Sequence, residues 1–360
     1  MPAPWLRRFW WRPLVPTILA SSVVSTAGMA VETLQGHRCL RLPAARPAGK
    51  PPLVVLGGTA QTVHSWVGHV QALSRDRDLL ILELRGQGPK NPALPPLDVS
   101  LPAQAADVAA VLESPDLGWR QEGPVDLVGF SFGARVALAV AAAHPGIVRR
   151  CVLTSVAADR GPVGRLVLKQ WEAILGRQES RDSLEAFAWA SILNTHAPDF
   201  LARNEPRVSG WVSLVAEGNT REGLLAILEQ THVEDPDHPD HALRHAAHVR
   251  KAGSVQGAVI CGGKDIVCNV ATAGQLAETA GWWAQQPADP NQHQAGAHDS
   301  QSRTMATPPP PPAAIVFPQC GHAVPLEDPT RWRKAVLEFL DEGTLPPPPS
   351  GGGSPEVPKQ

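Results

Sequence analysis

The chain has 360 residues, which is enough for one large domain with extensions, and a formal net charge of −2 at pH 7. A charge this close to zero gives no reason to expect a nucleic-acid partner. The five cysteines are odd in number and have no C-x-x-C spacing, so the sequence favours reduced, buried thiols over disulfides or a zinc site.

The first 31 residues differ from the rest of the chain in their charge. They contain Arg7, Arg8 and Arg12, and the first acidic residue is Glu32. A start that is rich in arginine, contains serine and lacks acids is typical of an organellar transit peptide, so we expect a chloroplast or mitochondrial protein. The alternatives are a secretory signal cleaved near Ala30, a membrane anchor and a disordered extension of a cytoplasmic protein. The uncharged stretch from Pro13 to Val31 is barely long enough to span a bilayer, and its second half is polar. We therefore expect no stable membrane insertion.

Residues 32–159 alternate short apolar runs with segments of helical character. The apolar runs predict strands at Thr33–Leu42, Leu53–Leu56, Leu79–Leu84, Val125–Val128 and Cys151–Ser155. The segments between them predict helices at Trp66–Leu73, Ala103–Leu112 and Ala134–Ala143. This alternation predicts an α/β fold with a mostly parallel, doubly wound sheet and right-handed crossovers. Ligands bind beyond the carboxyl ends of the strands in such sheets.

Residues 160–245 do not continue this alternation. Helix-like patterns follow one another at Leu166–Leu175, Leu184–Leu193, Val208–Val215 and Leu224–Leu228. No strand-like run separates these segments, so the sequence predicts an inserted helical lid over the sheet.

The alternating pattern returns in residues 246–342, which we expect to be the second part of the core. A strand is predicted at Ala258–Cys261 and a last one at Ala313–Phe317, with a final helix that begins at Pro329. Residues 285–312 form a polar, proline-containing insert, and the tail at 343–360 consists largely of proline, glycine and serine. Neither segment has the apolar residues to form a core, so we expect both to be disordered.

The pentapeptide Gly129–Gly133, with sequence G-F-S-F-G, lies between a predicted strand and a predicted helix. Glycines on both sides of Ser131 would let the strand and helix approach closely enough for a sharp turn. Such a turn exposes the serine hydroxyl. It also directs the first N–H groups of the helix toward the group that the hydroxyl attacks. The pentapeptide therefore predicts a nucleophile, and an ordinary glycine-rich turn is the alternative.

A serine needs a base to take its proton, and a histidine base needs an acid that fixes its tautomer. Asp265 and His322 each follow a predicted strand, so both should lie at the same edge of the sheet as Ser131. His293 and His298 also follow Asp265, but they fall in the insert, where nothing would hold an imidazole in place. The sequence thus predicts Ser131, Asp265 and His322 as catalytic residues.

Three further histidines, at 241, 245 and 248, have a spacing that can bind zinc from one helix face. No second metal motif accompanies them, and we expect a solvated polar face there. The sequence therefore predicts neither a metal nor a cofactor.

Residues 35–342 resemble the α/β-hydrolase fold superfamily. Gly129–Gly133 matches its nucleophile elbow, Gly262–Asp265 its acid turn and Gly321-His322 its histidine loop. The resemblance implies a Ser-His-Asp triad, and it implies Asp159 as an alternative acid because some members carry the acid after that strand. It also implies that Leu56–Thr59 is the oxyanion loop, so that the N–H groups of Thr59 and Phe132 would form the oxyanion hole.

The implied activity is that of a serine hydrolase, monomeric or dimeric, cleaving an ester or thioester of a small-to-medium molecule. The elbow followed by Arg135 is also similar to the lyase family that forms 2-succinyl-6-hydroxy-2,4-cyclohexadiene-1-carboxylate in quinone biosynthesis. Arg135 and Gly58 are therefore candidates for substrate binding, Arg135 through a bidentate contact with a carboxylate. A surface or ion-paired arginine is the alternative reading of Arg135. A ligand-binding relative without catalysis is a third possibility for the whole chain.

Overall fold

A computed structural model of the protein describes residues 30–88, 98–176, 181–231, 233, 235–282 and 314–344. The predicted insert at 285–312 lies outside the described residues, as do nearly all of the predicted targeting segment and of the tail. Among the described helices, none has the length and apolar character needed to span a membrane. All five cysteines are described, buried and unpaired, as the sequence predicts.

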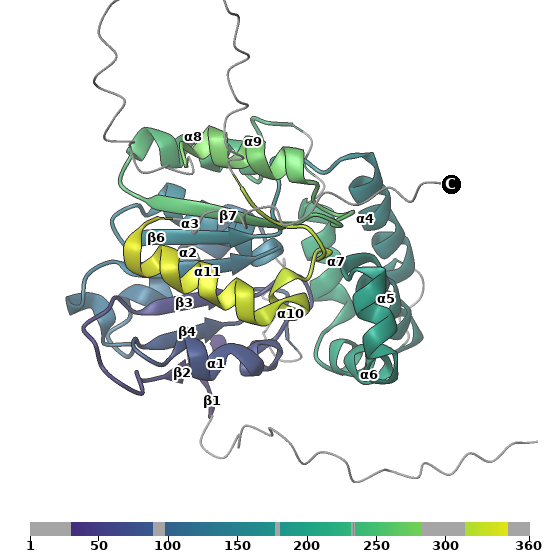
Figure 1. The fold of residues 1–360 in the computed structure, drawn as a ribbon, viewed down its shortest axis with the longest axis horizontal. Coiled ribbons are helices and arrows are strands. Elements are labelled where there is room, and N and C mark those ends of the chain that lie inside the picture. The colour runs from purple at the N-terminus through teal and green to yellow at the C-terminus, as the bar shows by residue number, and fades with distance from the viewer. Residues whose placement is uncertain are drawn as a thin grey trace, which may run out of the picture.

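The core of the structure is one eight-stranded sheet with the order β1-β2-β4-β3-β5-β6-β7-β8 (Figure 1). Its strands are β1 (Val31–Leu34), β2 (His37–Leu42), β3 (Leu53–Leu56), β4 (Leu79–Leu82), β5 (Val125–Phe130), β6 (Val148–Thr154), β7 (Gln256–Gly262) and β8 (Ile315–Phe317). Strands β3 to β8 pair in parallel, while β2 pairs antiparallel with both β1 and β4. The predicted mostly parallel, doubly wound sheet is confirmed.

The predicted first strand at 33–42 is instead a hairpin of two strands, β1 and β2. Gln35 has φ +49° and Gly36 has φ +85°. Two consecutive residues with positive φ form the tight turn that is typical of a β-hairpin. Such a turn reverses the chain, and a single strand across these residues was the wrong expectation.

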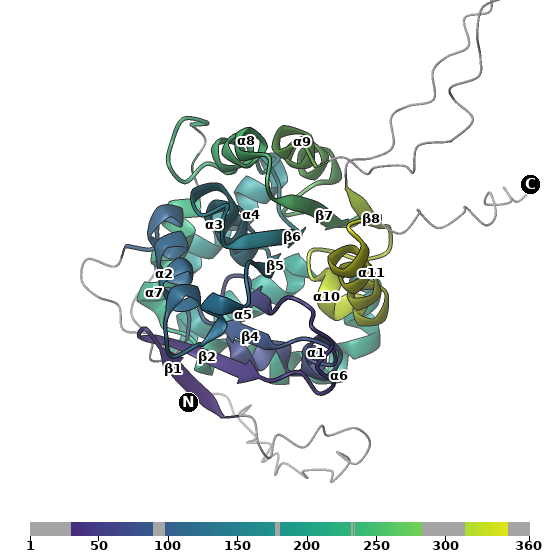
Figure 2. The same ribbon diagram turned by 90° about the vertical axis from the view of Figure 1, so that its left-hand side faces the viewer.

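Helices cover both faces of the sheet. On one face lie α2 (Leu101–Glu113), α3 (Phe132–Ala143), α8 (Ala242–Ala252) and α9 (Val270–Ala280). On the other lie α1 (Val67–Leu73) and α11 (Pro329–Glu342). Figure 2 shows these two layers on opposite sides of the strands. The strands are buried from both sides, which explains their continuous apolar runs.

Four further helices follow β6: α4 (Pro162–Leu175), α5 (Arg181–Thr195), α6 (Pro198–Glu217) and α7 (Arg221–Thr231). We call them the lid helices. Figure 1 shows them together at one end of the sheet. Helix α8 begins at Ala242, inside the range predicted for the lid, but it packs against α3 and α9 as part of the core.

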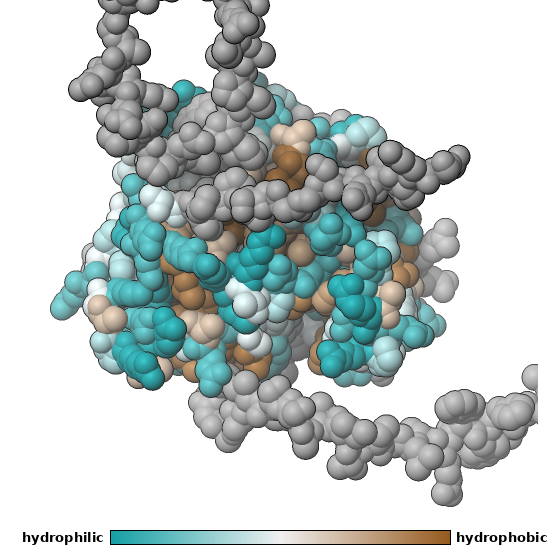
Figure 3. Space-filling model, in the orientation of Figure 1, coloured by the Kyte–Doolittle hydropathy of each residue, from teal (hydrophilic) through white to brown (hydrophobic). Residues whose placement is uncertain are grey.

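The surface in view in Figure 3 is largely hydrophilic, with apolar side chains in small separate areas. The most exposed large apolar side chains include two on the lid helices, Leu166 at 65% and Leu214 at 68% exposure. Leu214 also lines the cavity described below, so part of this exposure belongs to the cavity mouth.

Candidate active site

Ser131 occupies the turn between β5 and α3 in a backbone conformation that few residues adopt. Its φ is +53° and its ψ is −115°, and a non-glycine residue held there typically stores about 1–3 kcal/mol of strain. The Ser131 N–H donates to the carbonyl of Thr154 at 2.9 Å, and its own carbonyl accepts the N–H of Ala134 at 3.0 Å. Hydrogen bonds on both sides therefore hold the strained turn in place.

The glycines of the pentapeptide are required by the close approach of neighbouring backbone. A Cβ at Gly133 would lie 2.2 Å from the carbonyl oxygen of Leu56 and 2.4 Å from that of Gly57. A Cβ at Gly129 would lie 2.5 Å from the Cα of Ala134. The first turn of α3 is thus pressed against the end of β3, which brings the loop after β3 beside Ser131.

We expect Gly133→Ala to destabilise the protein by about 3 kcal/mol or more, because the added methyl group overlaps backbone that cannot move aside. Thermal unfolding measures the effect. Gly274→Ala is the matched control, since a Cβ at Gly274 in α9 would have no atom within 4 Å apart from its chain neighbours and the nearby backbone of its own helix. The control should unfold at or slightly above the wild-type temperature. Its free energy of unfolding should rise by up to about 1 kcal/mol, because alanine favours a helix more than glycine does. Equal stability of both variants would contradict the close approach.

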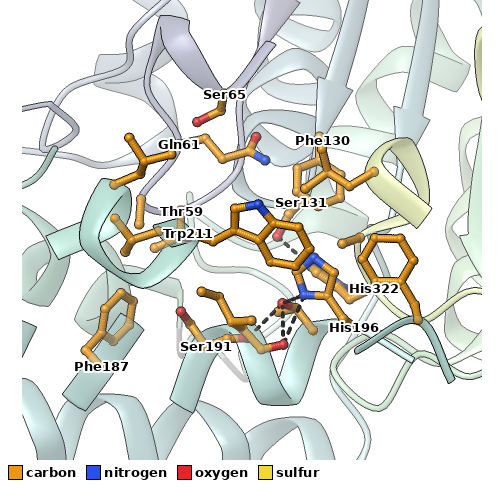
Figure 4. A pocket seen from close by; sticks show the side chains of 18 of the residues that line it. Thr59, Gln61, Ser65, Phe130, Ser131, Phe187, Ser191, His196, Trp211 and His322 are labelled. Atoms are coloured by element: carbon orange, nitrogen blue, oxygen red, sulfur yellow. Dashed lines mark hydrogen bonds between the residues drawn. The ribbon is translucent and has the colours of Figure 1, made fainter. Parts of the chain in front are cut away.

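The structure brings together the three residues predicted to be catalytic. The His322 Nε2 atom lies 2.8 Å from Ser131 Oγ, and its Nδ1 atom lies 2.8 Å from Asp265 Oδ2. Figure 4 shows Ser131 and His322 side by side at the cavity. Asp265 also accepts the N–H groups of Val267 and Cys268 at Oδ1, at 2.8 and 2.9 Å. Their catalytic role stays a prediction, and the geometry is that of a nucleophile, a base and an orienting acid.

The electrostatic environment of His322 favours its protonated form. Burial acts to lower its pKa, but the charge and hydrogen bond of Asp265, with a further contribution from Cys268, raise it above the ordinary value. Because Asp265 accepts a hydrogen bond from Nδ1, the neutral ring carries its proton there and leaves Nε2 as the acceptor for the Ser131 hydroxyl.

The alternative acid, Asp159, lies elsewhere. Its side chain is 50% exposed and pairs with Arg165 at 3.3 Å. The structure therefore places Asp265, and not Asp159, beside His322.

Arg135 is not among the residues that line the cavity, which favours the interpretation of a packed arginine over a contact with a substrate carboxylate. It is buried on the side of α3 that packs against the start of α8, and its Nη2 atom donates to the carbonyl of Asp240 at 2.5 Å. Burial lowers its pKa to about 9. One helical turn beyond Ser131 leads away from the cavity here, because α3 runs back along the sheet from the turn.

The predicted oxyanion loop lies directly beside Ser131. A Cβ at Gly58 would be 3.1 Å from the Cβ of Ser131, and Thr59 lines the cavity. Gly58 itself is occupied in the loop, because its N–H donates to Gln61 Oε1 at 2.9 Å and its carbonyl accepts Gln87 Nε2 at 2.6 Å. The N–H groups of Thr59 and Phe132 donate to no other residue that the structure describes. Both remain candidates for binding an oxyanion, whereas Gly58 acts as a support.

A cavity of about 470 Å³ opens over Ser131 and His322. Its walls come from the loop after β3, the elbow and the lid helices, and no carboxylate belongs to the described lining. The lid contributes Trp171, Phe187 and Trp211 among its apolar side chains, and Figure 4 shows Phe187 and Trp211 at the cavity. The helical spacing of these residues predicts burial, but it does not reveal that they face a cavity.

Glu327 connects the histidine loop to the base of the lid, and the sequence contains no signal for this role. Its carboxylate accepts the N–H of Gly321 at 3.0 Å and that of Ala197 at 3.1 Å. The N–H of Ala323 donates to the carbonyl of Thr195 at 2.9 Å. The chain between α5 and α6 is therefore fixed against the loop that carries His322.

The expected solvated face of histidines at 241, 245 and 248 is wrong for two of the three. His241 and His245 are 4% and 8% exposed, because α8 packs on α3. His241 caps α8 by accepting the N–H of Leu243 at 3.2 Å. Within the described residues, one group has three metal-ligating side chains close together, Asp265, Cys268 and His322, and two of these already bond to each other.

A family model described as the alpha/beta hydrolase fold matches residues 51–192. The chain is 30% identical over 154 residues to the pyrrolizixenacetamide deacetylase of Xenorhabdus hominickii, covering 42% of this chain and 54% of that protein. It is 25% identical over 166 residues to RutD of Pseudomonas syringae pv. syringae (strain B728a), a protein whose name assigns it carbamate hydrolysis; the match covers 46% of this chain and 60% of RutD. The chain thus spans little more than half the length of these relatives.

The fold extends further than the sequence likeness. The enol-lactonase of Burkholderia xenovorans LB400 superposes with a TM-score of 0.63 at 19% identity, covering 87% of this chain and all of that one. At 19% identity, this likeness shows a shared fold and nothing about a shared activity.

Proposed function

Because the chain belongs to the α/β-hydrolase fold superfamily, we propose that it is a serine hydrolase cleaving an ester or thioester of a small-to-medium molecule. The observation that carries the proposal is the continuous chain of hydrogen bonds from Ser131 through His322 to Asp265, with Ser131 and His322 at the wall of a cavity. The names of the relatives, which refer to a deacetylase and to carbamate hydrolysis, support attack on a carbonyl group.

In the proposed acylation step, Ser131 Oγ attacks the carbonyl carbon while His322 Nε2 takes the hydroxyl proton. The carbonyl oxygen becomes an oxyanion that the N–H groups of Thr59 and Phe132 would stabilise, and loss of one such donor typically costs about 3–4 kcal/mol. Collapse of the intermediate breaks the bond to the alcohol or thiol. His322 returns its proton to that leaving group, and Ser131 keeps the acyl group.

Deacylation repeats the same steps with water as the nucleophile. His322 takes a proton from water, hydroxide oxygen bonds to the acyl carbon, and the ester bond to Ser131 breaks. The proton then passes from His322 to Ser131, so the enzyme ends as it began. Asp265 stays ionised throughout and stabilises the imidazolium that forms twice in each cycle.

The position of Arg135, bound to the carbonyl of Asp240 and outside the described cavity lining, supports the hydrolase over the lyase alternative. A ligand-binding relative without catalysis would have no use for a serine held in strained backbone against a histidine. Both alternatives remain outcomes of the experiment below.

The proposal predicts that the wild-type protein hydrolyses p-nitrophenyl acetate. We expect turnover to pass through an acetyl adduct on Ser131, and where deacylation is the slower step this adduct accumulates with a burst of p-nitrophenol. A panel that adds a thioester, an anilide and a carbamate would rank the leaving groups. A folded protein that turns over none of them would contradict the hydrolase and favour the lyase or the binding protein.

A further inference from the structure

His196 belongs to a group of three near-parallel aromatic rings on the lid side of the cavity. Its ring lies 5.5 Å from that of Phe200 and 5.9 Å from that of Trp211, with interplanar angles of 14° and 18°. The rings of Phe200 and Trp211 are 6.0 Å apart at 15°. All three residues line the cavity. The three rings stack on one another, and the outer face of this stack suits a planar part of a ligand.

The hydrogen bonds of His196 determine which ring nitrogen carries the proton. Nδ1 lies 3.0 Å from the carbonyl oxygen of Ile192 and 3.1 Å from Thr195 Oγ1. The Thr195 hydroxyl already donates to the carbonyl of Ser191 at 2.7 Å. Because the carbonyl can only accept and the hydroxyl has used its proton, Nδ1 must be the donor. The neutral ring therefore has its lone pair on Nε2.

This lone pair faces the cavity without a protein partner. Nε2 bonds to no described residue, and it is not among their fully buried polar atoms, so it is open to the cavity that the ring lines. Burial, with a smaller effect from His322, lowers the pKa of His196 to about 4. At neutral pH the ring is therefore uncharged, and Nε2 accepts hydrogen bonds but cannot donate them.

Two other side-chain acceptors of the cavity wall are already engaged. Gln61 Oε1 accepts the N–H of Gly58 at 2.9 Å. Asn204 Oδ1 lies 3.4 Å from Arg207 Nη1. Since the described lining contains no carboxylate, His196 Nε2 is an open, neutral acceptor in this wall.

The position of His196 is also rigid. Its neighbours Thr195 and Ala197 are bonded to Ala323 and Glu327, on the segment that carries His322. A Cβ at Gly321 would lie 2.9 Å from the carbonyl carbon of His196, so the two chain segments are in close contact. An acceptor fixed in this way can discriminate between ligands, because little freedom is lost when it binds.

We propose that His196 is a specificity-determining residue that selects substrates bearing an N–H or O–H donor on a planar, aromatic or conjugated part. The planar part lies on Phe200 and Trp211, and its donor bonds to His196 Nε2. This inference rests on the proposed function, because it names the substrate class of the same cavity.

Calorimetric binding to the Ser131→Ala protein tests the proposal without turnover. The probes are the methyl esters of 2-, 3- and 4-hydroxyphenylacetic acid, each compared with its methoxy counterpart, which lacks the donor. We expect at least one hydroxy ester to bind about tenfold more tightly than its methoxy partner. The preference should vanish in Ser131→Ala/His196→Phe, which keeps an aromatic ring but removes the acceptor.

Further variants separate a specific contact from a general disturbance. Ser131→Ala/His196→Leu removes the acceptor by a second route, and thermal unfolding shows whether each variant is folded. Ser131→Ala/His64→Phe alters another histidine of the cavity wall and should keep the preference. The proposal is overturned if no hydroxy ester is preferred, if the preference survives in both His196 variants, or if the His64 variant removes it. Turnover of p-nitrophenyl acetate by the wild type tests the proposed function separately.

Discussion

Ser131→Ala is expected to lower kcat toward any ester by about 10⁴- to 10⁶-fold, because the nucleophile and its covalent intermediate are both lost. The variant should also fail to react with a fluorophosphonate, whereas the wild type should gain a single adduct. Intact mass after labelling, together with initial rates on p-nitrophenyl acetate, measures both effects. The substitution removes an oxygen whose partner is His322 Nε2, so the unfolding temperature should change little.

Ser191→Ala is the matched control. Ser191 also lines the cavity, but its hydroxyl donates to the carbonyl of Ala188 at 3.0 Å. This variant should label at close to the wild-type rate. An adduct that persists on Ser131→Ala would place the nucleophile elsewhere, and a folded wild type without any adduct would show that Ser131 is not activated.

Asp265→Asn should produce the second largest loss, about 10⁴-fold in kcat. An asparagine can present its amide NH₂ to His322 Nδ1, which favours the tautomer with the proton on Nε2, and that tautomer cannot accept the Ser131 proton. The imidazolium of each step also loses its counter-charge. Asp159→Asn is the control and should stay within about twofold of the wild type. Loss of turnover in Asp159→Asn alone would contradict the assignment of the acid.

The pH profile of Asp265→Asn provides an independent readout. The base must be neutral, so kcat/KM rises with pH through the pKa of His322. In the wild type, burial acts to lower that pKa, while Asp265 and Cys268 raise it above the ordinary value. Removing the carboxylate charge removes the main effect that raises the pKa of His322, while burial still lowers it. The rise in the residual kcat/KM should therefore move to lower pH. A rise at unchanged pH would mean that Asp265 does not act on His322.

The order and spacing of the core elements could be predicted from sequence, because a buried parallel strand requires a continuous apolar run and each crossover requires a helix. The same logic placed Ser131, Asp265 and His322 at one sheet edge. The hairpin at Gln35 could not be predicted, since the usual turn signal pairs asparagine or aspartate with glycine. Residue type alone did not indicate that Gln35 takes a positive φ.

What the sequence did not reveal depends on contacts between distant segments. Arg135 is buried because α8 packs on α3, and a helical period cannot say which neighbour covers which face. Nothing in the sequence separates His196 from other histidines. Its role depends on its hydrogen bond to the carbonyl of Ile192, its place at the cavity and its packing on Phe200 and Trp211. Glu327 looks like an ordinary helix-start acid until its two N–H partners, more than a hundred residues apart in the chain, are seen together.

The bonds of Glu327 also divide the lid into parts with different freedom to evolve. The junction from Thr195 to Ala197 is hydrogen-bonded to the segment that carries His322. We therefore expect a residue inserted in this junction to shift the His322 imidazole away from Ser131. Further along α6, Trp211 and Leu214 line the cavity and have no hydrogen bond to a described residue of the segment that carries His322. Trp211 still packs on His196, so we expect Leu214 to be the easier of the two to exchange without moving His322. Substrate preference in this scaffold should therefore diverge by substitution along α6, while the length of the α5–α6 junction stays constant.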